Sequence, residues 1–450
     1  MQRKKQKNIS KNSSPSVQTA SKSSNFATNV NTIDVKTFVL AIGLRIVTAL
    51  FLTDYLARSP EFVTPWNSFK RIKEAVHMID EYKISPYDGD SFHLMPLFLK
   101  VVGPFTYFPQ AYIVLSIALD IFSGIVLQFT AQTYLRKQTG ITVFDAEKCS
   151  KYVALMYLFN PMTIGSSAIG SISTLLNFII ALFIQTLFNN QVLIASVFAT
   201  FAIFIYPYYL VLLAPLIVAA KNQRLITIFA IFGSAGTLFG LNSLIENATK
   251  FLPDTFGFFW NIPDLSPNVG VFWYFFVFIF DQYRHFFQWT FQLTAVLPAI
   301  PLAMTLNKEP AVLVFACLGH VTVLSSYPSY AEATVLLALY PMFPKLLRYS
   351  RYTLIGFGSI VASFVLSPIM WRMWMITGSG NANFYFAIII VYVVALSFLI
   401  VDIMYNYARF EFSEQCAKEG ITNPEKIPEE FAIQGVIPFI HGVETSLKLS

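Results

Sequence analysis

Twelve apolar segments spread along the chain constrain its fold more than any other feature. Several approach the roughly 20 residues that a helix needs to cross a bilayer. They are residues 37–53, 110–134, 152–168, 171–188, 191–206, 208–220, 224–243, 285–306, 310–323, 330–344, 352–374 and 384–408. Charged residues make up only 12% of the 450 residues, about half the roughly 25% of a soluble protein. We therefore predict an all-α polytopic membrane protein with about 12 transmembrane helices, which excludes a soluble enzyme, a disordered scaffold and a secreted disulfide module.

Two further apolar stretches, residues 94–108 and 268–283, do not fit as additional crossings. Cytosolic loops of membrane proteins collect Lys and Arg. With twelve crossings, the basic N-terminus and the basic segments 135–151, 221–224 and 345–351 all lie in the cytosol. One extra crossing would invert everything that follows it. We therefore predict interfacial or re-entrant helices on the lumenal side for both stretches.

Three regions follow from this topology. Residues 1–36 are predicted to be a disordered basic cytosolic tail, residues 37–408 a multi-pass transmembrane domain with lumenal loops at 54–93 and 244–284, and residues 409–450 a polar cytosolic C-terminal tail. The net charge of +6 is explained by cytosolic loops, so no nucleic-acid partner is expected. The three cysteines are far apart, and they indicate neither a disulfide framework nor a metal site, so no cofactor is expected.

The most distinctive polar run begins at Asp264 and leads through Asn268 into an aromatic cluster that contains Trp273 and Tyr274. Asn268 could cap the helix that follows it. Trp and Tyr are enriched at the level of lipid headgroups, and this explains the cluster as an ordinary interfacial belt. A carboxylate and an amide directly before aromatic side chains also suit a ligand with a polar head and acyl tails.

A second polar run, residues 378–384, joins two late spans and contains Asn381 and Asn383. Each side-chain amide has donors and an acceptor, which could bond sugar hydroxyls or phosphate. The alternative is structural, with Gly380 at a helix C-cap and Asn383 at the next N-cap. The residues themselves support both interpretations.

The first lumenal loop ends in the pair Asp88 and Asp90 and in His93. Two carboxylates separated by one residue can hold a divalent metal, but a glycine between them and a proline upstream favour a turn. His93 precedes an apolar helix, where it could contact a lipid headgroup or pack inside the protein. Tyr327 belongs to another polar patch at the end of a span.

Two ionisable residues, Arg45 and Asp120, lie deep inside predicted spans, where an unpaired charge is costly. They could pair with one another. Asn247 begins the sequon Asn247-Ala248-Thr249 on the predicted lumenal side, where it would be available for N-glycosylation.

Several of these runs resemble the class U subunit of the glycosylphosphatidylinositol (GPI) transamidase. They are residues 85–96, 159–161, 263–276, 326–328 and 378–384. The resemblance extends over most of residues 38–408. It implies a multi-pass protein of the endoplasmic reticulum membrane that works with a cysteine-protease-like catalytic subunit and further membrane subunits in attaching GPI anchors to proteins.

The resemblance implies that this chain is not the catalytic subunit and that it recognises the GPI lipid or the attachment signal. The candidate lipid-binding residues are then Asn381, Asn383, Asp264, Asn268, Trp273, Tyr274, His93 and Tyr327. The family is also similar to lumenal mannosyltransferases of the GT-C type, which implies a GT-C-like fold. One alternative is therefore a mannosyltransferase using a dolichol-linked donor, with Asp54 or the Asp88/Asp90 pair as its acidic group. A second alternative is a purely architectural subunit.

Overall fold

A computed structural model describes residues 35–418, which belong to one compact unit. Within these residues the regular structure is entirely helical, with no β-strand. Most of the two predicted tails, residues 1–34 and 419–450, lies outside the described part of the chain. The prediction of an all-α fold is confirmed.

The helices follow the predicted apolar segments closely. The first half of the chain forms α1 (Val35–Phe51), α2 (Thr53–Leu56), α3 (Phe69–His77), η1 (Met78–Tyr82), α4 (Pro96–Val102), η2 (Gly103–Tyr107), α5 (Pro109–Lys137), α6 (Val143–Leu158), α7 (Pro161–Ala168), α8 (Ile172–Phe188), α9 (Val192–Ile205), η3 (Pro207–Leu212), α10 (Leu213–Ala220), η4 (Lys221–Gln223) and α11 (Arg224–Ile245). The second half forms α12 (Ala248–Asp254), α13 (Phe256–Asn261), α14 (Phe272–Phe278), α15 (Asp281–Val296), α16 (Ala299–Thr305), α17 (Pro310–Leu324), α18 (Tyr330–Leu339), η5 (Tyr340–Met342), α19 (Pro344–Leu347), α20 (Thr353–Met375) and α21 (Ala382–Lys418).

Four helical segments of the described chain are long and apolar enough to cross a membrane. They are Pro109–Lys137, Pro207–Ile245, Thr353–Met375 and Ala382–Cys416. Three shorter helices, α8, α9 and α17, are also apolar. These helices support a membrane protein, while the number of crossings stays a prediction. In the two stretches predicted to lie at the interface, α4 and α14 have seven residues each, about 10 Å of helix, which is too short to cross a bilayer.

Proline explains where predicted spans break into two helices. The predicted span 152–168 divides into α6 and α7 at Pro161, and Asn160 accepts a hydrogen bond from the backbone N–H of Met162 at 3.0 Å. The predicted span 285–306 divides into α15 and α16 next to Pro298. A proline lacks a backbone donor and clashes with the preceding turn, so it begins a helix more readily than it continues one.

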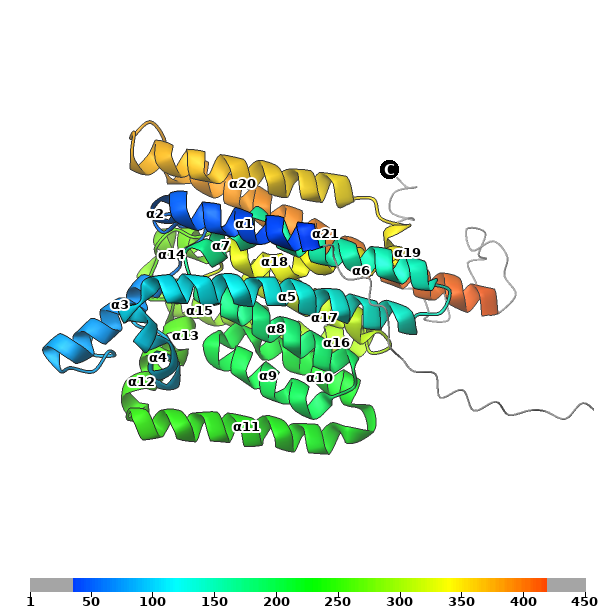
Figure 1. Cartoon of the computed structure of the whole chain (residues 1–450), viewed down its shortest axis with the longest axis horizontal. Coiled ribbons are helices and arrows are strands. Elements are labelled where there is room, and N and C mark those ends of the chain that lie inside the picture. Colours follow the sequence, from blue (N-terminus) through cyan, green and yellow to red (C-terminus); the bar gives the residue numbers. More distant parts are fainter. Residues whose placement is uncertain (1–34, 419–450) are drawn as a thin grey trace, which may run out of the picture. The chain divides into compact units, whose positions relative to one another are not determined.

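The interior is formed by α5, α8, α17 and α18, around which the other helices pack (Figure 1). α5 contacts both α6 and α8, and α20 pairs with α21 along much of its length. Every residue of α18 is buried. In contrast, α11 lies at the outside of the bundle, and only three of its residues are buried. Its apolar surface is available to lipid or to another protein.

A buried ion pair fastens the first helix to this interior. In α1, the Arg45 side chain is 2.7 Å from the carboxylate of Asp120 in α5, and both side chains are almost fully buried. The same guanidinium donates to the carbonyl oxygens of Ala41 and Leu158 at 3.0 and 2.9 Å and to the hydroxyl of Thr163 at 3.3 Å. The two charges that the sequence placed inside spans therefore neutralise one another.

The polar loops meet at one end of the bundle, near α3, α12 and α14 (Figure 1). There the indole N–H of Trp66 donates to the carbonyl oxygen of Tyr327 at 3.0 Å. Arg71 and Asp264 form an ion pair at 3.5 Å. Loops that are far apart in sequence thus share one surface.

Helices α16 and α19 and the C-terminal part of α21 lie at the opposite end (Figure 1). Lys308 pairs with Glu411, and the Lys345 ammonium donates to the carbonyl oxygen of Thr139. Helix α21 continues to Lys418, beyond residue 408 where the sequence predicts the polar tail to begin.

Candidate functional site

The segment between α13 and α14 is held in an extended path by its own polar side chains. The Asp264 carboxylate accepts hydrogen bonds from the backbone N–H and the hydroxyl of Ser266 at 2.8 and 2.5 Å. The side-chain oxygen of Asn268 accepts from the N–H of Gly270 at 2.8 Å, and its amide nitrogen donates to the carbonyl oxygen of Ser266 at 3.2 Å. Asn268 is 1% exposed, so its amide shapes the loop from inside.

The prediction that Asn268 caps the following helix was wrong. α14 begins later, and the residue at its N-cap, Val271, makes no side-chain capping bond. The physical reason is the Asx turn, which uses the Asn268 oxygen for Gly270 and leaves none for the helix. The carbonyl oxygen of Asn268 instead accepts from the indole N–H of Trp273 at 3.0 Å.

The aromatic cluster joins this loop to the end of α20 and the start of α21. Trp273 is 3% exposed and stacks on Trp374, with ring centroids 6.3 Å apart. Tyr274 stacks on Phe386 with centroids 3.8 Å apart. The Tyr274 hydroxyl donates to the side-chain oxygen of Asn383 at 2.6 Å. Two runs that the sequence analysis treated separately are therefore parts of one surface.

In the turn between α20 and α21, the capping residues differ from the predicted ones, which were Gly380 for the C-cap and Asn383 for the N-cap. Asn381, not Asn383, caps α21, because its side-chain oxygen accepts from the N–H groups of Asn383 and Phe384 at 3.0 and 3.4 Å. The glycine in the left-handed region after α20 is Gly378, with φ of 65°. Asn381 and Asn383 are both exposed. Asn381 thus has a structural role, and its amide nitrogen makes no hydrogen bond with any other described residue.

His93 and Tyr327 lie deeper, on either side of Phe258. The ring of His93 stacks on Phe258 with centroids 3.5 Å apart, and Phe258 stacks on Tyr327 at 4.7 Å. The Nδ1 atom of His93 is 3.0 Å from the carbonyl oxygen of Asp254. The Tyr327 hydroxyl accepts a hydrogen bond from the N–H of Asp264 at 3.2 Å.

Burial lowers the pKa of His93 to about 4 and outweighs the opposing effect of the Asp254 carbonyl. At neutral pH the ring is therefore uncharged, and Nδ1 carries the proton because its neighbour can only accept. Among the described residues Nε2 is buried without a hydrogen-bond partner. His93 packs inside the protein, as one of the two interpretations of the sequence expected.

The eight predicted residues thus separate into two groups. Asp264, Tyr274, Asn381 and Asn383 reach the surface. Asn268, Trp273, His93 and Tyr327 are buried beneath it. Three further residues of this surface were not predicted: Arg71, which reaches Asp264 from the first loop, and the aromatic partners Trp374 and Phe386. Trp371 and Trp374, one helical turn apart at the end of a span, were the available signal for the latter.

The carboxylates of the first loop make the contacts of a turn. One oxygen of Asp88 accepts from the N–H of Ser85 at 3.1 Å, and the other pairs with Lys250 at 3.4 Å. Asp54 is exposed in the short helix α2. No group of three or more His, Cys, Asp or Glu side chains between residues 35 and 418 could hold a metal ion.

Asn247 is exposed and caps α12, since its side-chain oxygen accepts from the N–H of Thr249 at 3.1 Å. The side-chain nitrogen, which is the glycosylation acceptor, makes no hydrogen bond with any other described residue. Use of the sequon stays a prediction.

Similarity to known proteins covers most of the chain. Residues 39–392 match the family described as GPI transamidase subunit PIG-U. The chain is 28% identical over 411 residues to the GPI-anchor transamidase component PIGU of Homo sapiens, which covers 83% of this chain and 94% of the human protein. It is 27% identical over 380 residues to the GPI transamidase component GAB1 of Saccharomyces cerevisiae, with 82% and 93% of the two chains covered. These matches confirm the family that the sequence motifs indicated.

Proposed function

The chain belongs to the PIG-U family of GPI transamidase subunits, and we propose on this basis that it is a non-catalytic subunit of the GPI transamidase complex. It resides in the endoplasmic reticulum membrane, crosses it about twelve times in a GT-C-like arrangement, and recognises the GPI lipid anchor or the attachment signal. A cysteine-protease-like subunit of the same complex performs the catalysis. The names of the related proteins, which call them transamidase components, support membership in the complex.

The observation that carries anchor recognition is the contact between Tyr274 and Asn383 at 2.6 Å. It brings the exposed amides of Asn381 and Asn383 next to an aromatic surface. A glycolipid presents hydroxyls and phosphate on one side and acyl chains on the other. Amides can bond the first part, and Tyr274 with its neighbours can border the second.

Among the candidate lipid-binding residues, the buried ones hold the exposed ones in position. Trp273 fixes the start of α14 through its bond to Asn268, and it packs against Trp374 of α20. Asp264 is held by Arg71 and Ser266, so its carboxylate is only partly free. We therefore assign direct contact with the anchor to Asn381, Asn383 and Tyr274, with Asp264 at the margin.

The test replaces the amides while keeping the helix cap. Ser is as good an N-cap as Asn, so Asn381→Ser removes the amide at little cost to α21. Combined with Asn383→Ala, it removes two hydrogen bonds of about 1 kcal/mol each, and anchor affinity should fall roughly tenfold to thirtyfold. The readout is surface display of a GPI-anchored reporter in cells that depend on this chain, together with recovery of the assembled complex.

Unchanged display at normal assembly would remove these residues from the site. A photoactivatable GPI analogue provides the second readout, because it should crosslink to the α14 segment and to the α20–α21 turn. Absence of crosslinking in an assembled, active complex would indicate an architectural subunit instead.

A further inference from the structure

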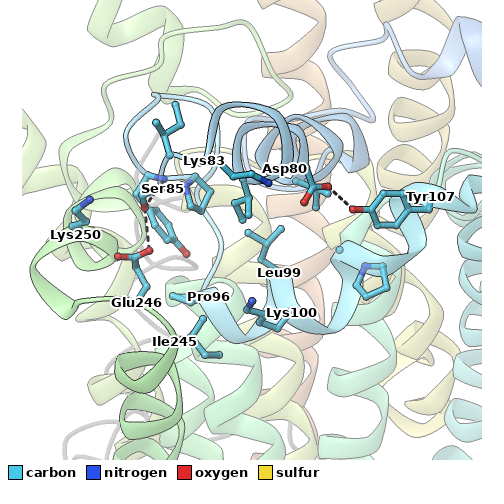
Figure 2. A pocket seen from close by; sticks show the side chains of 17 residues that line it. Asp80, Lys83, Ser85, Pro96, Leu99, Lys100, Tyr107, Ile245, Glu246 and Lys250 are labelled. Carbon is cyan, nitrogen blue, oxygen red and sulfur yellow. Dashed lines mark hydrogen bonds between the residues drawn. The ribbon is translucent and has the colours of Figure 1, made fainter.

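A pocket of about 610 Å³ lies apart from the site described above, between the first loop and the end of α11 (Figure 2). Its walls come from α3, η1, α4 and η2 and from the junction of α11 with α12. None of the eight candidate lipid-binding residues lines it.

Three lysines line this pocket, and two of them have no partner in the described part of the chain. Lys250 is paired with Asp88 at 3.4 Å. Lys83 and Lys100 make no hydrogen bond or ion pair with any residue between 35 and 418. Lys83 ends η1 in the left-handed conformation, with φ of 56°, as residues at helix C-termini often do.

The two carboxylates of the pocket, in contrast, are already engaged. Asp80 accepts a hydrogen bond from the Tyr107 hydroxyl. Glu246 accepts one from the Ser85 hydroxyl at 3.1 Å, and Figure 2 shows both contacts. A hydrogen bond from a hydroxyl leaves each carboxylate charged, so three lysines against two carboxylates give the lining an excess of one positive charge. The remaining wall is largely apolar and includes Leu99.

The position of the pocket indicates where its ligand comes from. Ile245 ends one apolar segment that is long enough to cross a membrane, and Pro109 begins another. Tyr107 and Phe108, directly before Pro109, are 62% and 69% exposed. Exposed aromatic side chains at the ends of spans mark the headgroup level of a bilayer, so the pocket opens where lipid phosphates are concentrated.

We propose that this pocket binds the phosphate of an anionic membrane lipid, with Lys83 and Lys100 on the phosphate and the apolar wall against the glycerol and the start of the acyl chains. Long lysine side chains can keep their stems on apolar surface while the ammonium groups reach a phosphate. This site is separate from the proposed anchor surface, and it does not depend on the function proposed above.

The test uses the intact complex in phosphatidylcholine nanodiscs that contain phosphatidylinositol with a diazirine in its acyl chain. Crosslinks should map to residues 76–107 and 245–250. Unlabelled phosphatidylinositol should compete, whereas diacylglycerol, which lacks the phosphate, should not. Competition by millimolar inorganic phosphate as strong as that of the lipid would indicate a free-phosphate site and overturn the lipid assignment.

Two double variants that remove the same charge, one inside the pocket and one outside it, test which lysines bind the phosphate. The double change K83Q and K100Q should reduce crosslinking about tenfold or more, since charge-assisted hydrogen bonds to phosphate are lost. The pair K70Q and K73Q removes the same charge from exposed positions of α3 outside the pocket and should have no effect.

The variant K83R and K100R keeps the charge and should retain binding, which separates loss of charge from loss of folding. Equal crosslinking in the glutamine variant, or equal losses in the K70Q and K73Q control, would refute the proposal. The proposal would also be refuted if the arginine variant assembled normally but lost as much crosslinking as the glutamine variant.

Discussion

The ion pair between Arg45 and Asp120 shows how a single contact decides whether a charged residue is tolerated inside a span. Each charge alone would have to leave water at a cost of several kcal/mol. Here the guanidinium has the carboxylate at 2.7 Å and the carbonyl oxygens of Ala41 and Leu158 as further acceptors. The pair is therefore better understood as a device that fixes α1 against α5 and α6 than as a source of net stability.

Removing one partner should be much worse than removing both. We expect Asp120→Leu to destabilise the protein by about 3–5 kcal/mol, because Arg45 stays buried without its counter-ion. The double variant Arg45→Met with Asp120→Leu should recover most of that loss. The measurement is the midpoint of thermal unfolding in detergent for the two single variants and the double variant. Additive losses in the double variant would show that the two residues act independently.

His93 should make the protein sensitive to mild acid. Its pKa is lowered from 6.5 to about 4, mainly by burial, so the folded protein disfavours the charged ring. Between pH 6.5 and about 4, His93 is mostly protonated in the unfolded chain and mostly neutral in the folded protein. Stability is therefore complete above pH 6.5 and declines as the pH falls toward 4, by about 2 kcal/mol at pH 5.

Unfolding temperatures measured from pH 7.5 to 5 test this effect. The slope should be shallower in His93→Phe, which keeps the stack on Phe258 and removes the titrating group. His285→Gln, at an exposed position, is the matched control and should keep the slope of the unchanged protein. Identical slopes in all three proteins would exclude His93 as the cause.

At the scale of helices, replacing a glycine by alanine has two opposing effects on stability. The added methyl group favours the helix but can clash with a neighbouring side chain, so the stability change can have either sign. A Cβ atom on Gly165 in α7 would lie 2.5 Å from the Phe62 ring. That ring is buried against Tyr330 and Phe364 and cannot move aside. Gly165→Ala should therefore cost about 1–3 kcal/mol, which exceeds any gain in helix propensity.

Gly233 in α11 provides the opposite case. Among the described residues, no atom from outside its own stretch of helix would lie within 4 Å of a Cβ atom added there. Gly233→Ala should raise stability by up to about 1 kcal/mol through helix propensity alone. Thermal unfolding of the two variants should show a lower midpoint for Gly165→Ala and a higher one for Gly233→Ala. A decrease for Gly233→Ala as large as that for Gly165→Ala would mean that another surface covers α11.

Element positions were predictable because hydropathy and helix-breaking residues act locally. The predicted span 171–188 became Ile172–Phe188, and 310–323 became Pro310–Leu324. The break at Pro161 was not predicted, although the proline is a helix-breaking residue, because the hydropathy of residues 152–168 is continuous across it.

The candidate surface was predictable only in part. Its polar runs stood out, but the bond between Tyr274 and Asn383 joins residues 109 positions apart. The cap on α21 was missed because Asn381 and Asn383 are equally good capping residues, and only the start of the helix distinguishes them. The lysine pocket was not predictable because Lys83, Lys100 and Lys250 are separate in the sequence and are exposed, and only the fold brings them to one pocket.

At the scale of the whole molecule, the polar loops and the basic segments predicted to be cytosolic lie at opposite ends of the helical bundle. One end holds the polar loops, linked by contacts such as that between Trp66 and Tyr327. The other holds charged residues of the basic segments, including Lys345, which reaches the carbonyl oxygen of Thr139. Helices long enough to cross a bilayer connect the two ends. The positive-inside rule places the end with the basic segments in the cytosol.

The proposed orientation can be tested with single cysteines in sealed microsomes. With the native residues Cys149, Cys317 and Cys416 replaced by serine, Asn307→Cys places a thiol in an exposed turn at the end with the basic segments, and Ser379→Cys places one at the end with the polar loops. A membrane-impermeant maleimide should label position 307 in intact vesicles and position 379 only after permeabilisation. Asp90→Cys, exposed in the first loop, should behave like position 379, because the contact between Arg71 and Asp264 ties that loop to the same end. Labelling of positions 90 and 379 from opposite sides would separate the loops across the bilayer, and neither the shared surface nor anchor recognition by it could then stand.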